Sequence, residues 1–112
     1  MVHLTWHKTL LLAEPQCPLT RPYAVEFSVA LGDALQRPGA RDFVLDMAGV
    51  KAVDGSGLGV VVRSATAARA AGQNFYLYRP SSEVLKALRG LEIQGFFPIL
   101  EYEEDLLAHM PD

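Results

Sequence analysis

Segments with the hydrophobic pattern of a strand alternate along this chain with segments that have the pattern of a helix. Within residues 4–12, Leu4, Trp6, Leu10 and Leu12 fall on one side, and this period of two is typical of a half-buried strand. From Thr20 they recur every three or four positions, which predicts a helix that Thr20 caps and that ends at Pro38-Gly39. Such alternation builds a sheet whose strands are joined by crossover helices, so the predicted fold class is α/β.

The apolar run from Phe43 to Met47 has the composition of a strand that is buried on both faces. We expect it to be the central strand of a mixed, mostly parallel sheet. A second helix is predicted after the segment Asp54–Gly59, running to about Ala71, where Gly72 ends it. The remaining predicted elements are a loop at 14–18, a strand at 74–79, a helix from Pro80, a short strand within 96–100 and a helix over 103–110.

Length and charge limit the classes of protein to which the chain can belong. Its 112 residues suffice for one domain, so residues 1–112 are predicted to form a single domain. The net charge of −3 and the lack of a basic run argue against a nucleic-acid partner. The apolar run Leu10–Ala13 is too short to insert into a membrane, and the single cysteine, Cys17, fits a reducing compartment. We therefore expect a cytoplasmic protein.

The segment Asp54-Gly55-Ser56-Gly57-Leu58-Gly59 is the part of the sequence that best fits a functional site. It lies where a buried strand region gives way to a helix, and the free N–H groups of a helix N-terminus favour an anion. A hydroxyl at Ser56 is well placed to carry a phosphate there. The alternative is that Ser56 is only the N-cap of the helix and Asp54 a turn residue. The residues alone leave both interpretations open.

Motifs of enzymes and metal sites do not fit this segment or its surroundings. A nucleophile elbow requires glycine where Asp54 and Leu58 stand, and the glycines of Asp54–Gly59 lack the spacing of a dinucleotide-binding loop. No lysine follows, as a P-loop would require. His3 and His7 share one strand, with no Cys, Asp or Glu between them. We therefore expect no catalytic residue, no cofactor and no metal.

The two sides of the predicted second helix differ in character. One side is an apolar stripe of the kind that packs on a sheet. The other side is small and lightly charged, so a partner protein could approach it closely, and an arginine there could pair with an acidic group. These candidate partner-binding residues are Arg63, Thr66, Ala67 and Ala70, with Gly59 beside them.

The stretch FVLDMAGVKAVDGSGLG, from Phe43 to Gly59, resembles the central signature of STAS domains, in particular bacterial anti-sigma-factor antagonists. The order of the elements that follow is also similar to that family. It includes a helix that ends in Ala71-Gly72, an apolar strand, Pro80-Ser81 before a short helix, a Phe97-Pro98-Ile99 segment and an acidic last helix. The resemblance implies a STAS-like mixed sheet with crossover helices packed mainly on one face.

In that family, regulation is by partner switching. The unmodified antagonist binds an anti-sigma factor that is also a serine kinase, the kinase phosphorylates the antagonist, and a phosphatase reverses the modification. By motif position the acceptor is Ser56, and its phosphorylation loop consists of Asp54, Gly55, Gly57, Leu58 and Gly59. The resemblance also implies a binding protein without enzymatic activity, as a monomer or a weak homodimer.

Two positions differ from the family pattern. Gly55 replaces the first serine of the usual pair, and the Gly-Glu-Leu-Asp that follows the first strand is Glu14-Pro15-Gln16-Cys17 here, without an aspartate. The missing aspartate favours an alternative function. In that alternative the chain is a STAS scaffold that is not phosphorylated and acts in a larger signalling or transport-associated complex.

Overall fold

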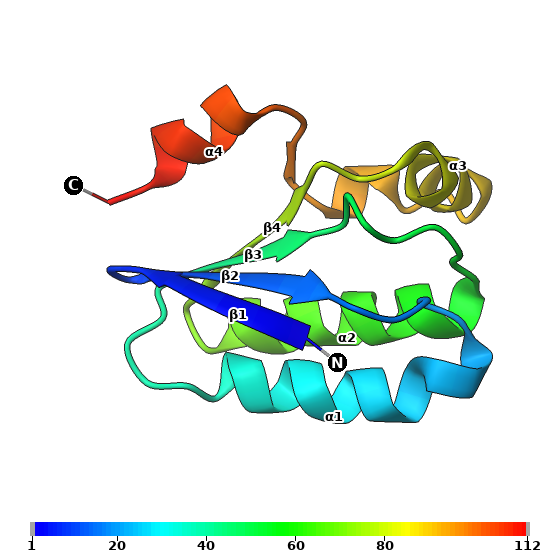
Figure 1. Ribbon diagram of the computed structural model, residues 1–112, viewed down its shortest axis with the longest axis horizontal. Helices are drawn as coiled ribbons and strands as arrows, with labels where there is room; N and C mark the ends of the chain where they lie inside the picture. The colour runs from blue at the N-terminus through cyan, green and yellow to red at the C-terminus, as the bar shows by residue number, and fades with distance from the viewer. Residues whose placement is uncertain (1, 112) are drawn as a thin grey trace.

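The computed structural model describes residues 2–111, and its centre is one mixed sheet (Figure 1). The strands follow one another across the sheet in chain order. The first pair is antiparallel and every later pair is parallel, so the predicted mixed, mostly parallel sheet is confirmed. Its strands are β1 (Val2–His7), β2 (Leu10–Pro15), β3 (Asp42–Asp46), β4 (Asn74–Tyr78) and β5 (Ile99–Leu100).

Helices cover the two faces of the sheet unequally. The helices α1 (Ala24–Leu35) and α2 (Gly55–Ala70) lie side by side against one face (Figure 1). Together with α3 (Ser82–Gly90) they share the larger hydrophobic core. The short helix α4 (Glu103–His109) covers part of the other face through Leu106. The prediction of helices mainly on one face is thus confirmed. None of the helices within residues 2–111 has the length and apolar content needed to cross a membrane.

The strand β3 is the buried centre of the sheet, as its sequence predicts. Every side chain from Phe43 to Met47 is buried, because β3 lies between β2 and β4 and has helices on both faces. The ring of Phe43 stacks on that of Phe75 in β4, with centroids 5.3 Å apart. This strand therefore fixes the position of the segment that follows it, which carries Ser56.

The N-terminal segment is a hairpin and not the single strand that we predicted over residues 4–12. Lys8 adopts a left-handed backbone conformation (φ +52°) and reverses the chain between β1 and β2. Trp6 consequently pairs with Leu11 on the face that carries α1, whereas Leu10 lies on the opposite face. The prediction that Leu4, Trp6, Leu10 and Leu12 share one face is therefore wrong.

Two predicted boundaries near the hairpin also change. The strand β2 extends to Pro15, where we predicted a loop, and Pro15 is buried opposite Val2. The first long helix starts later than expected, because Arg21–Tyr23 form a 3₁₀ turn before α1. Within the described residues Thr20 forms no side-chain capping bond to that turn. The side chain of Asp54, from a distant part of the chain, provides this cap instead.

Candidate functional site

Asp54 is the N-cap of α2. Its backbone is extended, and its Oδ1 atom accepts a hydrogen bond from the Gly57 N–H at 3.0 Å. The helix therefore begins at Gly55, so Gly55, Gly57, Leu58 and Gly59 belong to its first turns and not to a preceding loop. The alternative in which Ser56 is the N-cap is wrong, because Ser56 lies at the second position of the helix.

The same carboxylate also holds the start of the first helical segment. The Oδ2 atom of Asp54 accepts a hydrogen bond from the Arg21 N–H at 2.9 Å. This N–H group opens the 3₁₀ turn, where Thr20 provides no cap. Hydrogen bonds from the N–H groups of Gly57 and then Arg21 lower the pKa of Asp54 from its ordinary value of 3.8. Asp54 thus joins two helix starts that are 33 residues apart in the chain.

The stability of the protein should depend on the charge of Asp54. Because folding lowers the pKa of this carboxyl group, its contribution is present above pH 3.8 and is lost as the pH falls through the lower folded value. We expect Asp54→Ala to lower the melting temperature at pH 7, and the difference from wild type to shrink in acid.

Thermal unfolding between pH 7 and pH 2.5 measures this effect, with Asp54→Asn as the control. Asparagine is also a good N-cap but does not ionise in this range, so this variant should show a weaker dependence on pH. If the difference in melting temperature between wild type and Asp54→Ala stayed constant with pH, the charge of Asp54 would not contribute to stability.

A close backbone contact fixes the first turn of α2 against the segment that follows β2. Leu19 donates its N–H to the carbonyl of Ala52 at 2.9 Å and accepts from the Asp54 N–H at 3.0 Å. Gly57 is buried against this segment, and a Cβ atom at Gly57 would overlap the carbonyl group of Leu19. Position 57 thus requires glycine because two backbones meet there, which the sequence pattern does not reveal.

The other two glycines of the motif are not required by packing. A Cβ atom at Gly55 would meet no other atom within 4 Å, so the loss of the family's first serine leaves open space and no altered contact. A Cβ atom at Gly59 would meet only the flexible guanidinium end of Arg63, at 3.3 Å.

Ser56 is exposed at this helix start. Among the side-chain hydrogen bonds within residues 2–111, none involves the Ser56 hydroxyl, so it is accessible to a modifying enzyme. The N–H groups of Gly57 and Arg21 are already bound by Asp54. A phosphate on Ser56 would therefore add its charge next to an existing carboxylate, which would make this end of α2 strongly negative.

The candidate partner-binding side of α2 is open to solvent. Arg63, Thr66, Ala67 and Ala70 are all exposed, and Gly59 is half-buried. The open surface continues onto α1, where the side chains of Val25 and Val29 are 78% and 59% exposed. A groove of about 230 Å³ lies between the two helices, and it is lined by Ala24, Val25, Ser28, Val29, Val60 and Arg63. Our sequence analysis did not identify the part on α1, although two valines one helical turn apart at exposed positions could have indicated it.

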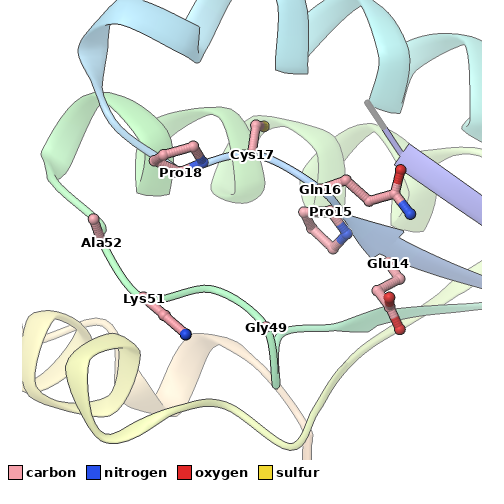
Figure 2. Close-up of a pocket in the computed structure, with 8 residues that line it drawn as sticks. All are labelled: Glu14, Pro15, Gln16, Cys17, Pro18, Gly49, Lys51 and Ala52. Atoms are coloured by element: carbon pink, nitrogen blue, oxygen red, sulfur yellow. The ribbon is translucent and has the colours of Figure 1, made fainter.

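The segment that lacks the family's aspartate lines a second groove (Figure 2). This groove has a volume of about 420 Å³ and separates the β2–α1 connection from the β3–α2 connection. Burial raises the pKa of the Cys17 thiol, so the thiol is not activated for chemistry. The lining residues are Glu14, Pro15, Gln16, Cys17, Pro18, Gly49, Lys51 and Ala52.

A buried carboxylate lies at the C-terminal end of the central strand β3. Asp46 is only 2% exposed, and its Oδ2 atom lies 2.7 Å from the Arg79 Nη2 atom. Its Oδ1 atom accepts from the Ala48 N–H at 3.1 Å. The hydrogen bond that Arg79 donates to Asp46 raises the pKa of Arg79, so the arginine remains charged. This pair fixes the backbone where β3 gives way to the connection that leads to Ser56.

Residues 7–106 match the family model described as the STAS domain. The chain belongs to the STAS domain family. No curated protein matches the chain in sequence.

Solved structures of low sequence identity share the fold of this STAS domain. The Thermotoga maritima protein TM1081 superposes with a TM-score of 0.86 at 18% identity, covering 97% of this chain and 93% of that one. The phosphorylated form of the Bacillus cell fate determinant SpoIIAA gives 0.71 at 13% identity, over 99% and 100%. A sulfate transporter family protein from Wolinella succinogenes gives 0.76 at 16%, over 91% and 84%.

Proposed function

We propose that this STAS domain is an anti-sigma-factor antagonist that is switched by phosphorylation of Ser56. The observation that carries the proposal is an exposed serine hydroxyl, without a partner in residues 2–111, on a helix turn held rigidly by Asp54 and Leu19. A kinase can reach such a hydroxyl without unfolding the helix, because the N-cap bonds are made by Asp54. The unmodified protein binds an anti-sigma serine kinase, and the phosphorylated protein releases it.

The physical basis of the switch is charge. A phosphate adds about −1.5 to −2 charges at neutral pH, to a chain whose net charge is −3. The partner surface that we propose begins at Ser56 and continues along the exposed side of α2 through Arg63 and Thr66. A partner that contacts Arg63 with an acidic group would be repelled by the new charge. The protein acts as a binding module and not as an enzyme, in the cytoplasm, and a phosphatase restores the unmodified form.

A second candidate function rests on the segment after β2. This segment holds Gln16 and Cys17 and no aspartate, and it lines the groove of Figure 2. If a kinase requires an acidic residue there, Ser56 stays unmodified and the domain serves as a constitutive interaction module. The fold is compatible with that role, because a sulfate transporter family protein shares it.

The mass of the intact protein purified from its own cells distinguishes the two functions. We expect a fraction that carries one phosphate, that disappears after phosphatase treatment and that is missing in Ser56→Ala. Ser82→Ala is the matched control, because Ser82 is also exposed near a helix start but lies outside the motif. If phosphate persisted in Ser56→Ala, the acceptor would be a residue other than Ser56. A protein without phosphate under all growth conditions would favour the constitutive module.

A further inference from the structure

The strand β1 forms an edge of the sheet with an unpaired side. It pairs with β2 on one side, and no strand of the described chain pairs with the other (Figure 1). The backbone hydrogen bonds made outside the helices and strands of residues 2–111 also include none to β1. One row of N–H and C=O groups is therefore available over the six residues of this strand.

The register of the hairpin identifies the residues whose backbone groups point outward. In an antiparallel pair, opposite residues alternate between hydrogen-bonded and non-hydrogen-bonded pairs. The carbonyl of Thr9 accepts from Arg41 and Asp42 on the side of β3, so by alternation Pro15 also faces β3. Val2 lies opposite Pro15, which has no N–H, and this is therefore a non-hydrogen-bonded pair. By alternation, the residues bonded to β2 are His3, Thr5 and His7. The outward N–H and C=O groups belong to Val2, Leu4 and Trp6.

This edge lacks the features that usually prevent pairing between chains. Exposed edge strands are commonly protected by proline, by charged side chains or by bulges. The sequence Val-His-Leu-Thr-Trp-His of β1 contains no proline, no lysine or arginine and no acidic residue. Trp6, the single tryptophan of the chain, leaves 42% of its surface exposed at this edge. This edge is thus suited to pairing with a further strand, and that strand would also cover the apolar ring of Trp6.

We propose that β1 pairs with β1 of a second copy of this chain, antiparallel and centred on Leu4. In this register Leu4 lies opposite Leu4 of the partner subunit, and Val2 lies opposite Trp6 of the partner subunit. All three outward residues then form hydrogen-bonded pairs, each of which exchanges two hydrogen bonds. A shift by two residues in either direction would leave at least one of the three unpaired. The two sheets become one continuous sheet across the two-fold axis.

The side chains on both faces fit this pairing. On the face that carries α1, Trp6 packs on Val2 of the partner subunit, and aromatic pairs with β-branched residues favour strand association. On the other face, His3 lies opposite Thr5 of the partner subunit, so no like charges meet. A single strand pair is small compared with the interface of a stable complex, so the dimer forms reversibly and depends on concentration. The pairing does not involve Ser56 and is independent of the proposed switch.

Sedimentation velocity and tryptophan fluorescence over a wide concentration range test the pairing. We expect the mass to rise from monomer towards dimer, and the Trp6 emission to shift to shorter wavelength over the same range as the ring leaves water. A protein that remains monomeric, or that dimerises without any change in Trp6 emission, would overturn the proposal.

Two double variants that differ only at residue 5 test the register. His3 and Thr5 are both exposed, so substitutions there should change the stability of the monomer little. His3→Lys with Thr5→Glu places opposite charges across the axis twice and should tighten the dimer. His3→Lys with Thr5→Lys places like charges there and should weaken it, each by roughly two- to thirtyfold relative to His3→Lys alone. Equal dimerisation of the two double variants would exclude this register.

Discussion

Gly57→Ala is expected to lower the free energy of unfolding by about 1–3 kcal/mol, the usual cost of overpacking a tight site. The added methyl group would overlap the carbonyl of Leu19. Leu19 cannot move aside easily, because its N–H and C=O groups are bonded to Ala52 and Asp54. Helix propensity predicts the opposite sign, since alanine is favoured over glycine within a helix by about 1 kcal/mol. The direction of the effect therefore separates the backbone contact from propensity.

Denaturant unfolding of three single variants measures this effect. Gly55→Ala and Gly59→Ala are the matched controls, because a Cβ atom at Gly55 has open space and one at Gly59 meets only a flexible side-chain end. Both should unfold at the same denaturant concentration as wild type or a higher one. If Gly57→Ala behaved as these two do, the contact with Leu19 would not constrain the first turn of α2.

The elements that the sequence predicts best are those whose pattern is set by local burial. Phe43 to Met47 reads as a strand buried on both faces because helices and neighbouring strands surround it. The stripe on α2 has the helical period for the same reason, since Leu58, Val61 and Ala65 pack on the sheet. In these two segments the hydrophobic pattern fits only one environment, which is burial on both faces for the strand and burial of one side for the helix.

The N-terminal hairpin could not be predicted in this way. Its turn is formed by Lys8 and Thr9, and neither is among the residues that usually mark a tight turn. Lys8 reverses the chain with a left-handed backbone that lysine rarely adopts. Leu4 and Trp6 before the turn and Leu10 and Leu12 after it all lie at alternate positions of one continuous series, so the period of two does not show where the strand ends.

The most important contact of the candidate site was also hidden from the sequence. Asp54 appears in the motif as a turn residue, and nothing near it in the chain indicates a bond to Arg21. The bond exists because β2 and β3 are parallel neighbours, so the connections that leave them emerge side by side at the same edge of the sheet. Only the order of the strands reveals that one carboxylate caps two helical segments.

Because Asp54 and not Ser56 caps α2, substitutions at Ser56 should have small effects on stability. Because Asp54 is the N-cap, Ser56→Ala removes no capping bond and should change the free energy of unfolding by less than about 0.5 kcal/mol. Ser56→Asp places a negative charge in the first turn, which favours the helix by about 0.3–1 kcal/mol, and the nearby carboxylate of Asp54 opposes this gain. Both variants should therefore melt close to wild type.

Ser56→Ala and Ser56→Asp should differ in their affinity for the partner although they have similar stability. Ser56→Ala is expected to retain wild-type affinity for the anti-sigma kinase but to remain bound after kinase and ATP are supplied, because it has no acceptor hydroxyl. Ser56→Asp should bind at least about tenfold more weakly, equivalent to about 1.4 kcal/mol, since its charge imitates part of the phosphate. Titration calorimetry of both variants against the anti-sigma factor recovered with the wild-type protein measures the difference, and melting curves of the same samples show that both are folded. Equal affinities for the alanine and aspartate variants would end the proposal that Ser56 is the switch, and the domain would then act as a constitutive module.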